Sequence, residues 1–147
     1  NPGFFTDKNV VRELRKIAKK REITRRDLMF VIKSGDIGGV GETTANYNVI
    51  SSTKDVSGYA AALTRMEEAA SKNGFGDITV ALWGSVTSGD RAGTVMASVQ
   101  APTSERLGAF FDQRDSSWMS EAMSTFDGIR TPVVDFMMQC TTLSVNN

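Results

Sequence analysis

The chain has 147 residues, which is enough for one domain with a single hydrophobic core and too few for a multidomain enzyme. It contains no histidine and one cysteine, Cys140, so an internal disulfide, a Ser-His triad, a histidine-ligated haem and the common zinc sites are excluded within one chain. No apolar run approaches the ~20 residues of a membrane-spanning helix. We therefore predict no metal, no cofactor and no membrane span.

The net charge of zero is unevenly distributed along the chain. Residues 1–43 hold ten Lys and Arg against six Asp and Glu, and residues 44–147 hold seven against eleven, so the first part carries +4 and the second −4. A basic arm of this kind favours an anionic partner, whether nucleic acid, a membrane surface or the acidic remainder of the chain itself. The chain begins with Asn1 rather than Met, which fits removal of a leader, and leaves a cytoplasmic or an organellar location open.

Two helices are predicted in the basic arm. Asp7 is placed to cap the first, which runs to about Arg21 and carries an apolar stripe opposite a row of Lys and Arg side chains. Thr24 and Asp27 have the spacing of a capping box, which predicts a second short helix containing the apolar run Leu28–Ile32.

The glycine-rich stretch Gly35–Glu42 is predicted to be a linker. It lacks the Gly-Lys-Ser/Thr of a phosphate-binding loop and precedes a strand rather than a helix. The chain is therefore divided into a basic helical arm with its linker, residues 1–43, and a main domain, residues 44–147.

The main domain opens with a strand and a helix. Thr43–Ser51 alternates two kinds of side chain, with Tyr47 and Val49 on one face, which predicts a strand. Ser52 and Asp55 then form a capping box for a helix that ends at Asn73 and Gly74.

A β-hairpin is predicted next, from Ile78–Thr87 and Gly93–Gln100, with a turn at Ser88–Ala92. Neither face of its strands is clearly polar, so we expect a sheet that is covered on both sides. Beyond the hairpin, a helix over Thr103–Arg114 is interrupted at Asp115–Ser117 and continues before a stop at Asp127 and Gly128.

The last predicted element is a strand over Thr131–Thr141, so that the order from residue 44 is strand, helix, strand, strand, helix, strand. This order predicts an α+β fold, the ferredoxin-like βαββαβ unit with a four-stranded antiparallel sheet, to which the helical arm is added.

This part of the chain resembles the dimeric α/β-barrel superfamily, which includes antibiotic-biosynthesis-type monooxygenases, NIPSNAP-like proteins and stress-responsive barrel proteins. The resemblance covers residues 44–145 and is carried by four features, which in chain order are the Trp83-Gly84 strand, the turn with Gly89 and Gly93, the interrupted helix with Asp115 and Trp118, and the strand start Thr131-Pro132-Val133. It implies a dimer in which two sheets face each other. Residues 1–43 depart from the family pattern.

The resemblance also implies a small-ligand pocket between the sheet and its own helices. Its expected lining combines polar and apolar side chains, namely Asn46, Asn48, Tyr59, Trp83, Ser85, Met96, Ser98 and Asp135. Asn48 and Trp83 are of interest because cofactor-free oxygenases of this superfamily use Asn and Trp around an activated organic substrate, although they commonly add a His. Asp135 lies mid-strand in an apolar run, and burial there would raise its pKa and make it a candidate general base. An ion pair with Arg91 or Arg130, or exposure at a sheet edge, is the alternative for this carboxylate.

Three functions remain open at this level. The leading hypothesis is a non-catalytic α/β-barrel protein that acts as an interaction or accessory subunit, forming a homodimer or binding a partner through its sheet face and its arm, with room for a small ligand. The alternative is a cofactor-independent monooxygenase or isomerase acting on a small organic substrate, with Asp135, Asn48 and Trp83 as catalytic residues and Tyr59, Ser85, Met96 and Ser98 as ligand-binding residues. The second alternative is nucleic-acid binding through the basic arm, which predicts an affinity that falls steeply with salt. Cys140 is interpreted as a small core residue.

Overall fold

The computed structural model describes residues 8–18, 28–35, 38–86 and 91–142. Its elements, in chain order, are α2 (Lys8–Ala18), β1 (Met29–Lys33), β2 (Thr43–Thr53), α3 (Val56–Lys72), β3 (Thr79–Ser85), β4 (Thr94–Ala101), α4 (Ser104–Phe111), the 3-10 turn η1 (Asp112–Asp115), α5 (Ser117–Ser124) and β5 (Arg130–Thr141). The predicted α+β class is confirmed.

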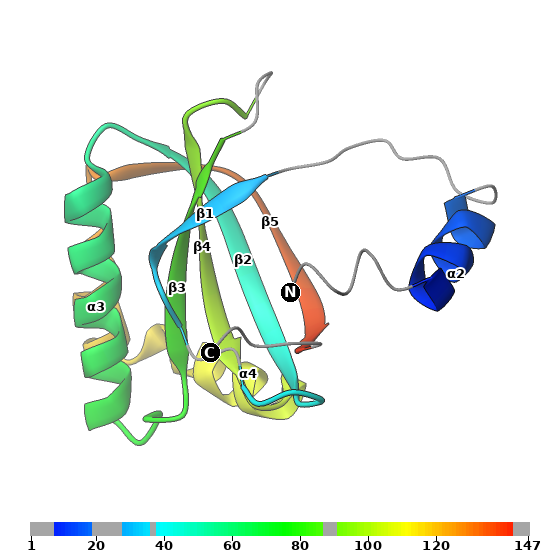
Figure 1. Cartoon of the computed structure of the whole chain (residues 1–147). Helices are drawn as coiled ribbons and strands as arrows, with labels where there is room; N and C mark the ends of the chain where they lie inside the picture. Colours follow the sequence, from blue (N-terminus) through cyan, green and yellow to red (C-terminus); the bar gives the residue numbers. More distant parts are fainter. Residues whose placement is uncertain (1–7, 19–27, 36–37, 87–90, 143–147) are drawn as a thin grey trace.

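The strands form one antiparallel sheet in the order β1-β3-β4-β2-β5, with β1 and β5 at its two edges (Figure 1). From β2 onward the chain follows strand, helix, strand, strand, helix, strand, and the four strands of this unit lie in the order β3-β4-β2-β5. This arrangement is the ferredoxin-like one. The sheet has five strands rather than the four predicted, because β1 adds a fifth beside β3.

The two faces of the sheet follow from side-chain alternation and from the register of its strands. Tyr47 is paired with Val99 and Met137, and Asn48 with Ser98 and Phe136, so these two rows point to opposite faces. The row of Tyr47 faces α3, α4 and α5, and we call this side the helix face. The row of Asn48 lies on the side that these three helices leave uncovered, which we call the outer face.

Side-chain caps place the helices that cover the helix face. The Asp55 carboxylate accepts a hydrogen bond of 2.7 Å from the Gly58 N–H and so caps α3, whereas the predicted cap at Ser52 is wrong because that residue still belongs to β2. Thr103 caps α4 and Ser116 caps α5, with η1 between them. The predicted interruption of this helix is confirmed.

The hydrophobic core lies between the helix face and these helices. Its fully buried large side chains are supplied by α3, α4 and the central strands, and they include Tyr59, Leu63, Val80, Leu82, Leu107 and Phe110. Burial of such a side chain stabilises the fold by about 1.5–3 kcal/mol. In contrast, β5 is exposed over most of its length, with Val133 59% and Met137 62% exposed, because it is an edge strand.

The predicted second helix through Leu28–Ile32 is wrong, because Met29–Lys33 forms strand β1. This strand pairs with β3 and places the ring of Phe30 over Gly84, where a Cβ would come within 2.4 Å of the ring. The capping box proposed for that helix lies in residues 19–27, outside the described residues. The division of the chain at residue 43 remains a prediction.

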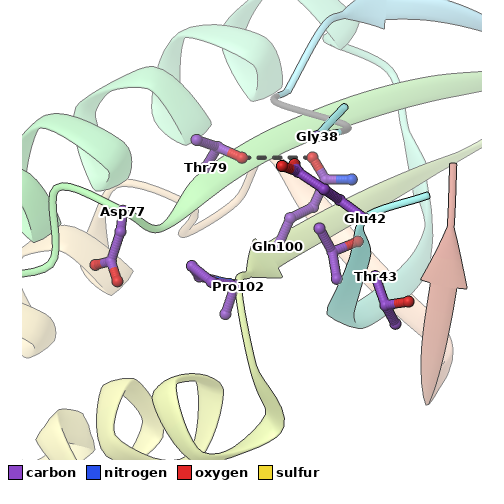
Figure 2. Close-up of a pocket in the computed structure, with 9 residues that line it drawn as sticks. Gly38, Glu42, Thr43, Asp77, Thr79, Gln100 and Pro102 are labelled. Carbon is purple, nitrogen blue, oxygen red and sulfur yellow. Dashed lines mark hydrogen bonds between the residues drawn. The ribbon is translucent and has the colours of Figure 1, made fainter. Parts of the chain in front are cut away.

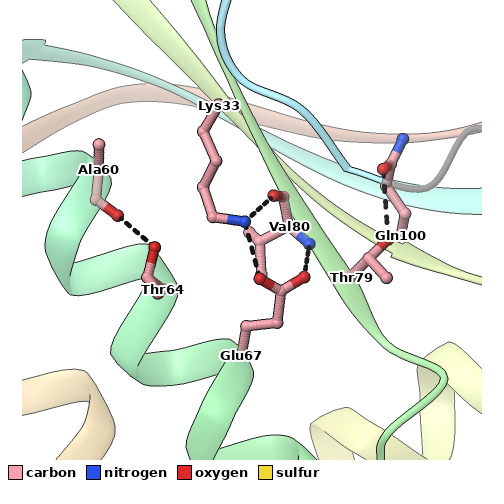
Figure 3. Close-up of polar contacts among 7 residues, drawn as sticks. All are labelled: Lys33, Ala60, Thr64, Glu67, Thr79, Val80 and Gln100. Atoms are coloured by element: carbon pink, nitrogen blue, oxygen red, sulfur yellow. Dashed lines mark hydrogen bonds and ion pairs between the residues drawn. The ribbon is translucent and has the colours of Figure 1, made fainter.

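Where β1 ends, two side chains of opposite charge complete the edge of β3 (Figure 3). Glu67 on α3 accepts a hydrogen bond of 3.0 Å from the Val80 N–H, and the Lys33 ammonium donates to the Val80 carbonyl at 2.8 Å and to Glu67 at 2.7 Å. These side chains occupy the positions that a longer neighbouring strand would take. They satisfy the backbone of a residue that is 0% exposed.

Helix α2 stands apart from the sheet in Figure 1. Its exposed residues include Arg12 and Lys16, which pair with Glu13 in the same helix. Among the described helices, none is both long and apolar enough to cross a membrane.

A candidate ligand cavity between the sheet and its helices

A cavity of about 330 Å³ lies between the helix face and the helices α3, α4 and α5. This volume is within the range of small-molecule sites, and the lining is mostly aromatic and aliphatic. The walls are formed by Tyr47, Val49, Leu63, Met66, Ala97, Val99, Phe110, Phe111, Met119, Met123, Phe126 and Pro132, and the charged residues in contact with the cavity are Arg114, Arg130 and Asp135.

Tyr47 and Asp135 form a hydrogen-bonded pair in this lining. Val49 is paired with Asp135 and Tyr47 with Met137, so Tyr47 and Asp135 are diagonal neighbours on the helix face. The Tyr47 hydroxyl donates to Asp135 Oδ2 at 2.6 Å. Burial, together with this hydrogen bond to the carboxylate, raises the pKa of Tyr47 to about 12. At neutral pH the phenol therefore keeps its proton and the carboxylate is the acceptor of the pair.

Arg130 provides the positive charge at the same end of the cavity. Its guanidinium lies 4.5 Å from the centre of the Phe126 ring and 5.4 Å from that of Tyr59. Its Nη1 donates a hydrogen bond of 2.8 Å to the Tyr59 hydroxyl. Because Tyr59 is 0% exposed, it holds Arg130 in place from within the core.

The aromatic wall is set by edge-to-face packing. Phe111 meets Tyr47 with ring centres 5.0 Å apart and an angle of 80° between the rings, and Phe110 packs against Phe111 at 5.6 Å. These contacts orient the Tyr47 ring toward the cavity and leave its hydroxyl beside β5.

Of the residues predicted for this pocket, the structure brings Asp135 and Tyr59 to it. Asp135 contacts the cavity directly, and Tyr59 supports it through Arg130. Of the alternatives given for Asp135, exposure at a sheet edge is confirmed and burial in an apolar run is wrong, because Asp135 lies on the edge strand β5. The polar partner that the structure gives it is Tyr47.

The other predicted residues lie elsewhere, so the eight side chains do not line one pocket. The five from the central strands contact a separate hollow on the outer face, and they are Asn46, Asn48, Trp83, Met96 and Ser98. Ser85 lies at the end of β3, two residues from Trp83, and is paired with Met29. Placing these side chains toward the helices was wrong because α3, α4 and α5 cover the opposite set of alternating residues.

A further hollow, of about 370 Å³, lies at the end of the sheet beside the glycine-rich loop (Figure 2). Glu42, Asp77, Thr79 and Gln100 contribute its polar lining, and the Thr79 hydroxyl donates to Gln100 Oε1 at 3.5 Å. The Asp77 carboxylate is already engaged by Arg106, at 2.7 Å from both Nε and Nη2. This hollow is open, and its described lining contains no aromatic or large aliphatic side chain, so we place the candidate site in the cavity under the helices.

No group of three or more Cys, Asp or Glu side chains is placed to hold a metal ion in the part of the chain that the structure describes. The cavity itself presents one carboxylate beside two guanidinium groups, which repel cations. Its chemistry is therefore that of organic ligands with a polar or acidic group.

Comparison with known proteins gave distant similarities in fold only. No family model matches the chain, and no curated protein matches it. Two solved structures are similar at 7% identity: a candidate monooxygenase from Lactobacillus acidophilus NCFM, with a TM-score of 0.47 over 90% of this chain, and an anthrone oxidase-like protein, with a TM-score of 0.48 over 93%. The chain spans 60% and 66% of the lengths of these two proteins. We therefore base its function on its own residues.

Sequence reasoning did not single out Tyr47 and Arg114 as functional residues. Tyr47 was recognised as a strand residue that shares a face with Val49, but its partner depends on the register between β2 and β5, which is not visible in either segment. Arg114 lies in η1, directly after the amphipathic helix α4 with Phe110 and Phe111, and its place just beyond a helix that faces a sheet was the available signal.

Proposed function

We propose that the chain is a cofactor-independent enzyme that removes a proton from a small, mainly aromatic organic molecule, as a monooxygenase or an isomerase. The observation that carries the proposal is the Tyr47–Asp135 pair at the polar end of an apolar cavity of about 330 Å³. A cavity of this size with a convergent carboxylate favours an enzyme over a protein with a filled core.

In this proposal Asp135 is the general base. Tyr47, with a pKa of about 12, keeps its proton at neutral pH and cannot be the base. The carboxylate is therefore the member of the pair that accepts a proton from an acidic C–H or O–H group of the substrate. The Arg130 guanidinium, which keeps N–H groups besides the one donated to Tyr59, is the hydrogen-bond donor for the oxygen on which negative charge develops, and the Tyr47 hydroxyl positions the Asp135 carboxylate. The aromatic wall packs against the rings of the substrate.

Both reaction types begin with the same step. In an isomerase, the proton returns to a different atom of the substrate anion. In a monooxygenase without cofactor, the substrate anion itself reduces dioxygen, and a CH₂ group and O₂ become a carbonyl group and water. We assign Asn48 and Trp83 no role in this step, because both lie on the outer face of the sheet.

The leading interpretation from sequence, a non-catalytic accessory subunit, is the second candidate. It is supported by the exposed apolar side chains of the edge strand β5, among them Val133 and Met137. Dimer formation and a role for the basic arm, including nucleic-acid binding, remain predictions that are tested by the size of the particle and by salt-dependent binding.

Proton abstraction can be measured without dioxygen. Anthrone is a suitable probe because loss of a methylene proton gives an aromatic aryloxide anion, and exchange of its methylene hydrogens for deuterium in anaerobic D₂O is read by NMR. We expect wild-type protein to accelerate this exchange and Asp135→Asn to reduce the acceleration by about 10²–10⁴-fold. Oxygen consumption on admission of air then separates the monooxygenase from the isomerase.

The matched control is Asp127→Asn, which removes an exposed carboxylate outside the cavity. It should leave the exchange rate unchanged. Equal rates for wild type and Asp135→Asn, or equal loss in both variants, would contradict the assignment of Asp135 as the base.

A further inference from the structure

The outer face contains a hollow of about 290 Å³ that the proposed reaction does not use. It lies across β2, β3, β4 and β5, and no residue of α3, α4 or α5 is part of its lining. The sheet separates it from the cavity under the helices, since neighbouring residues such as Tyr47 and Asn48 face opposite sides.

Two buried hydrogen-bond donors in this hollow lack a partner. The side-chain amide nitrogen Nδ2 of Asn48 and the indole nitrogen Nε1 of Trp83 are both buried and make no hydrogen bond in the structure, and Asn48 as a whole is 2% exposed. Buried donors of this kind are nearly always satisfied in folded proteins, because leaving them unpaired is costly. Two of them in one hollow indicate a missing acceptor.

The chemistry of the missing group follows from the lining. The indole nitrogen can only donate, so its partner must be an acceptor. None of the described residues that line the hollow is charged, and they combine Asn48, Trp83, Ser98 and other polar residues with the polarisable side chains Met96, Met138 and Cys140, which suits an uncharged occupant. Binding of an anion would be unfavourable, because the anion would lose its hydration without gaining a positive partner in the hollow.

We propose that the outer face is a second binding site, for a small uncharged organic molecule that presents a carbonyl-type oxygen to the Asn48 amide and the Trp83 indole. The strands fix the two donors: Asn48 is paired with Ser98 on β4, and Trp83 with Met96, two residues along the same strand. Asn48 and Trp83 therefore line the hollow from either side of β4, and Met96 and Ser98 lie between them.

The test uses acetophenone as the acceptor probe, ethylbenzene as the analogue without an acceptor, and benzoate as the charged analogue. Binding to the full chain labelled with ¹⁵N is followed by two-dimensional NMR up to millimolar concentration. Trp83→Phe assigns the Trp83 indole signal, because the chain has only two tryptophans. We expect acetophenone to shift the Trp83 indole N–H and the Asn48 amide signals downfield, and ethylbenzene and benzoate to bind at least tenfold more weakly.

Substitution of the donors gives a second, independent readout. Asn48→Leu removes an unpaired polar group in favour of an apolar one of similar size, so the free protein should gain roughly 2–4 °C in Tm while its affinity for acetophenone falls about tenfold or more. Asp127→Asn is the matched control, since Asp127 is exposed and lines neither the hollow nor the cavity under the helices. It should leave the binding of acetophenone to the outer face unchanged.

Three outcomes would overturn the proposal. The first is the absence of any acetophenone-dependent shift at Trp83 or Asn48. The second is equal binding of acetophenone and ethylbenzene. The third is a dimer in light scattering that dissociates in the Asn48→Leu variant, because the donors would then be satisfied by a second copy of the chain.

Discussion

Replacing Glu67 with Ala should destabilise the fold far more than a surface substitution does. Glu67 accepts from the Val80 N–H at 3.0 Å and from the Lys33 ammonium at 2.7 Å, and it joins α3 to the end of β1 and to β3. Its removal leaves the N–H of a fully buried residue without a partner, which costs about 1–3 kcal/mol. Loss of the partly exposed ion pair adds up to about 1 kcal/mol.

The expected loss of about 1–4 kcal/mol in the free energy of unfolding corresponds to a drop of roughly 2–16 °C in Tm. Urea unfolding followed by circular dichroism measures it, and Glu68→Ala, an exposed neighbour in the same helix, is the matched control. Hydrogen exchange of the Val80 amide should become faster in Glu67→Ala alone. A stability within about 0.5 kcal/mol of the Glu68→Ala control, or unchanged exchange at Val80, would refute this account of the sheet edge.

Three further predictions concern the site and the packing around it. Spectrophotometric titration should show Tyr47 ionising near pH 12. Asp135→Asn should lower this pKa but leave it above 10, because burial of Tyr47 is the largest cause of the shift. The stabilisation linked to the phenol proton is complete below pH 10 and is lost as pH rises toward 12. Arg106→Gln should lower Tm at pH 7, and the difference from wild type should become smaller as pH falls through the pKa of Asp77, which the guanidinium holds below 3.8, because only the contacts of Arg106 with Gly74 and Phe75 then remain. Gly84→Ala should lower Tm by displacing β1, whose aromatic ring occupies the position of the new methyl group, and unchanged exchange of the β1 amides would contradict this contact.

The strands and helices of the main domain were predictable because their signals are local. The start of α3 near Asp55, the break before Ser116 and the alternation in β2 are each contained within a few residues, and all three are found in the structure, although the cap is Asp55 and not the predicted Ser52. Strand β1 was missed because a run of five apolar residues has no period that separates helix from strand. Its β-branched Val31 and Ile32 and the following Gly35 favoured the strand.

The candidate site was less predictable because it depends on which face the helices cover. Alternation correctly separated Tyr47 and Val49 from their neighbours, but both sets of residues are largely buried, so polarity alone did not identify the helix face. The pairing of Tyr47 with Asp135 joins residues 88 positions apart and follows only from the register of β2 with β5. Long-range register of this kind is set by tertiary packing.

The two borders of the sheet differ in how many backbone groups they offer to another chain. Strand β1 has five residues, whereas β5 has twelve and carries exposed apolar side chains such as Met137. If two molecules were to join β5 to β5 about a twofold axis, each would bury its longer border, and only the short one would remain for a third molecule. Assembly through backbone pairing would then end at a closed pair instead of growing into a fibre.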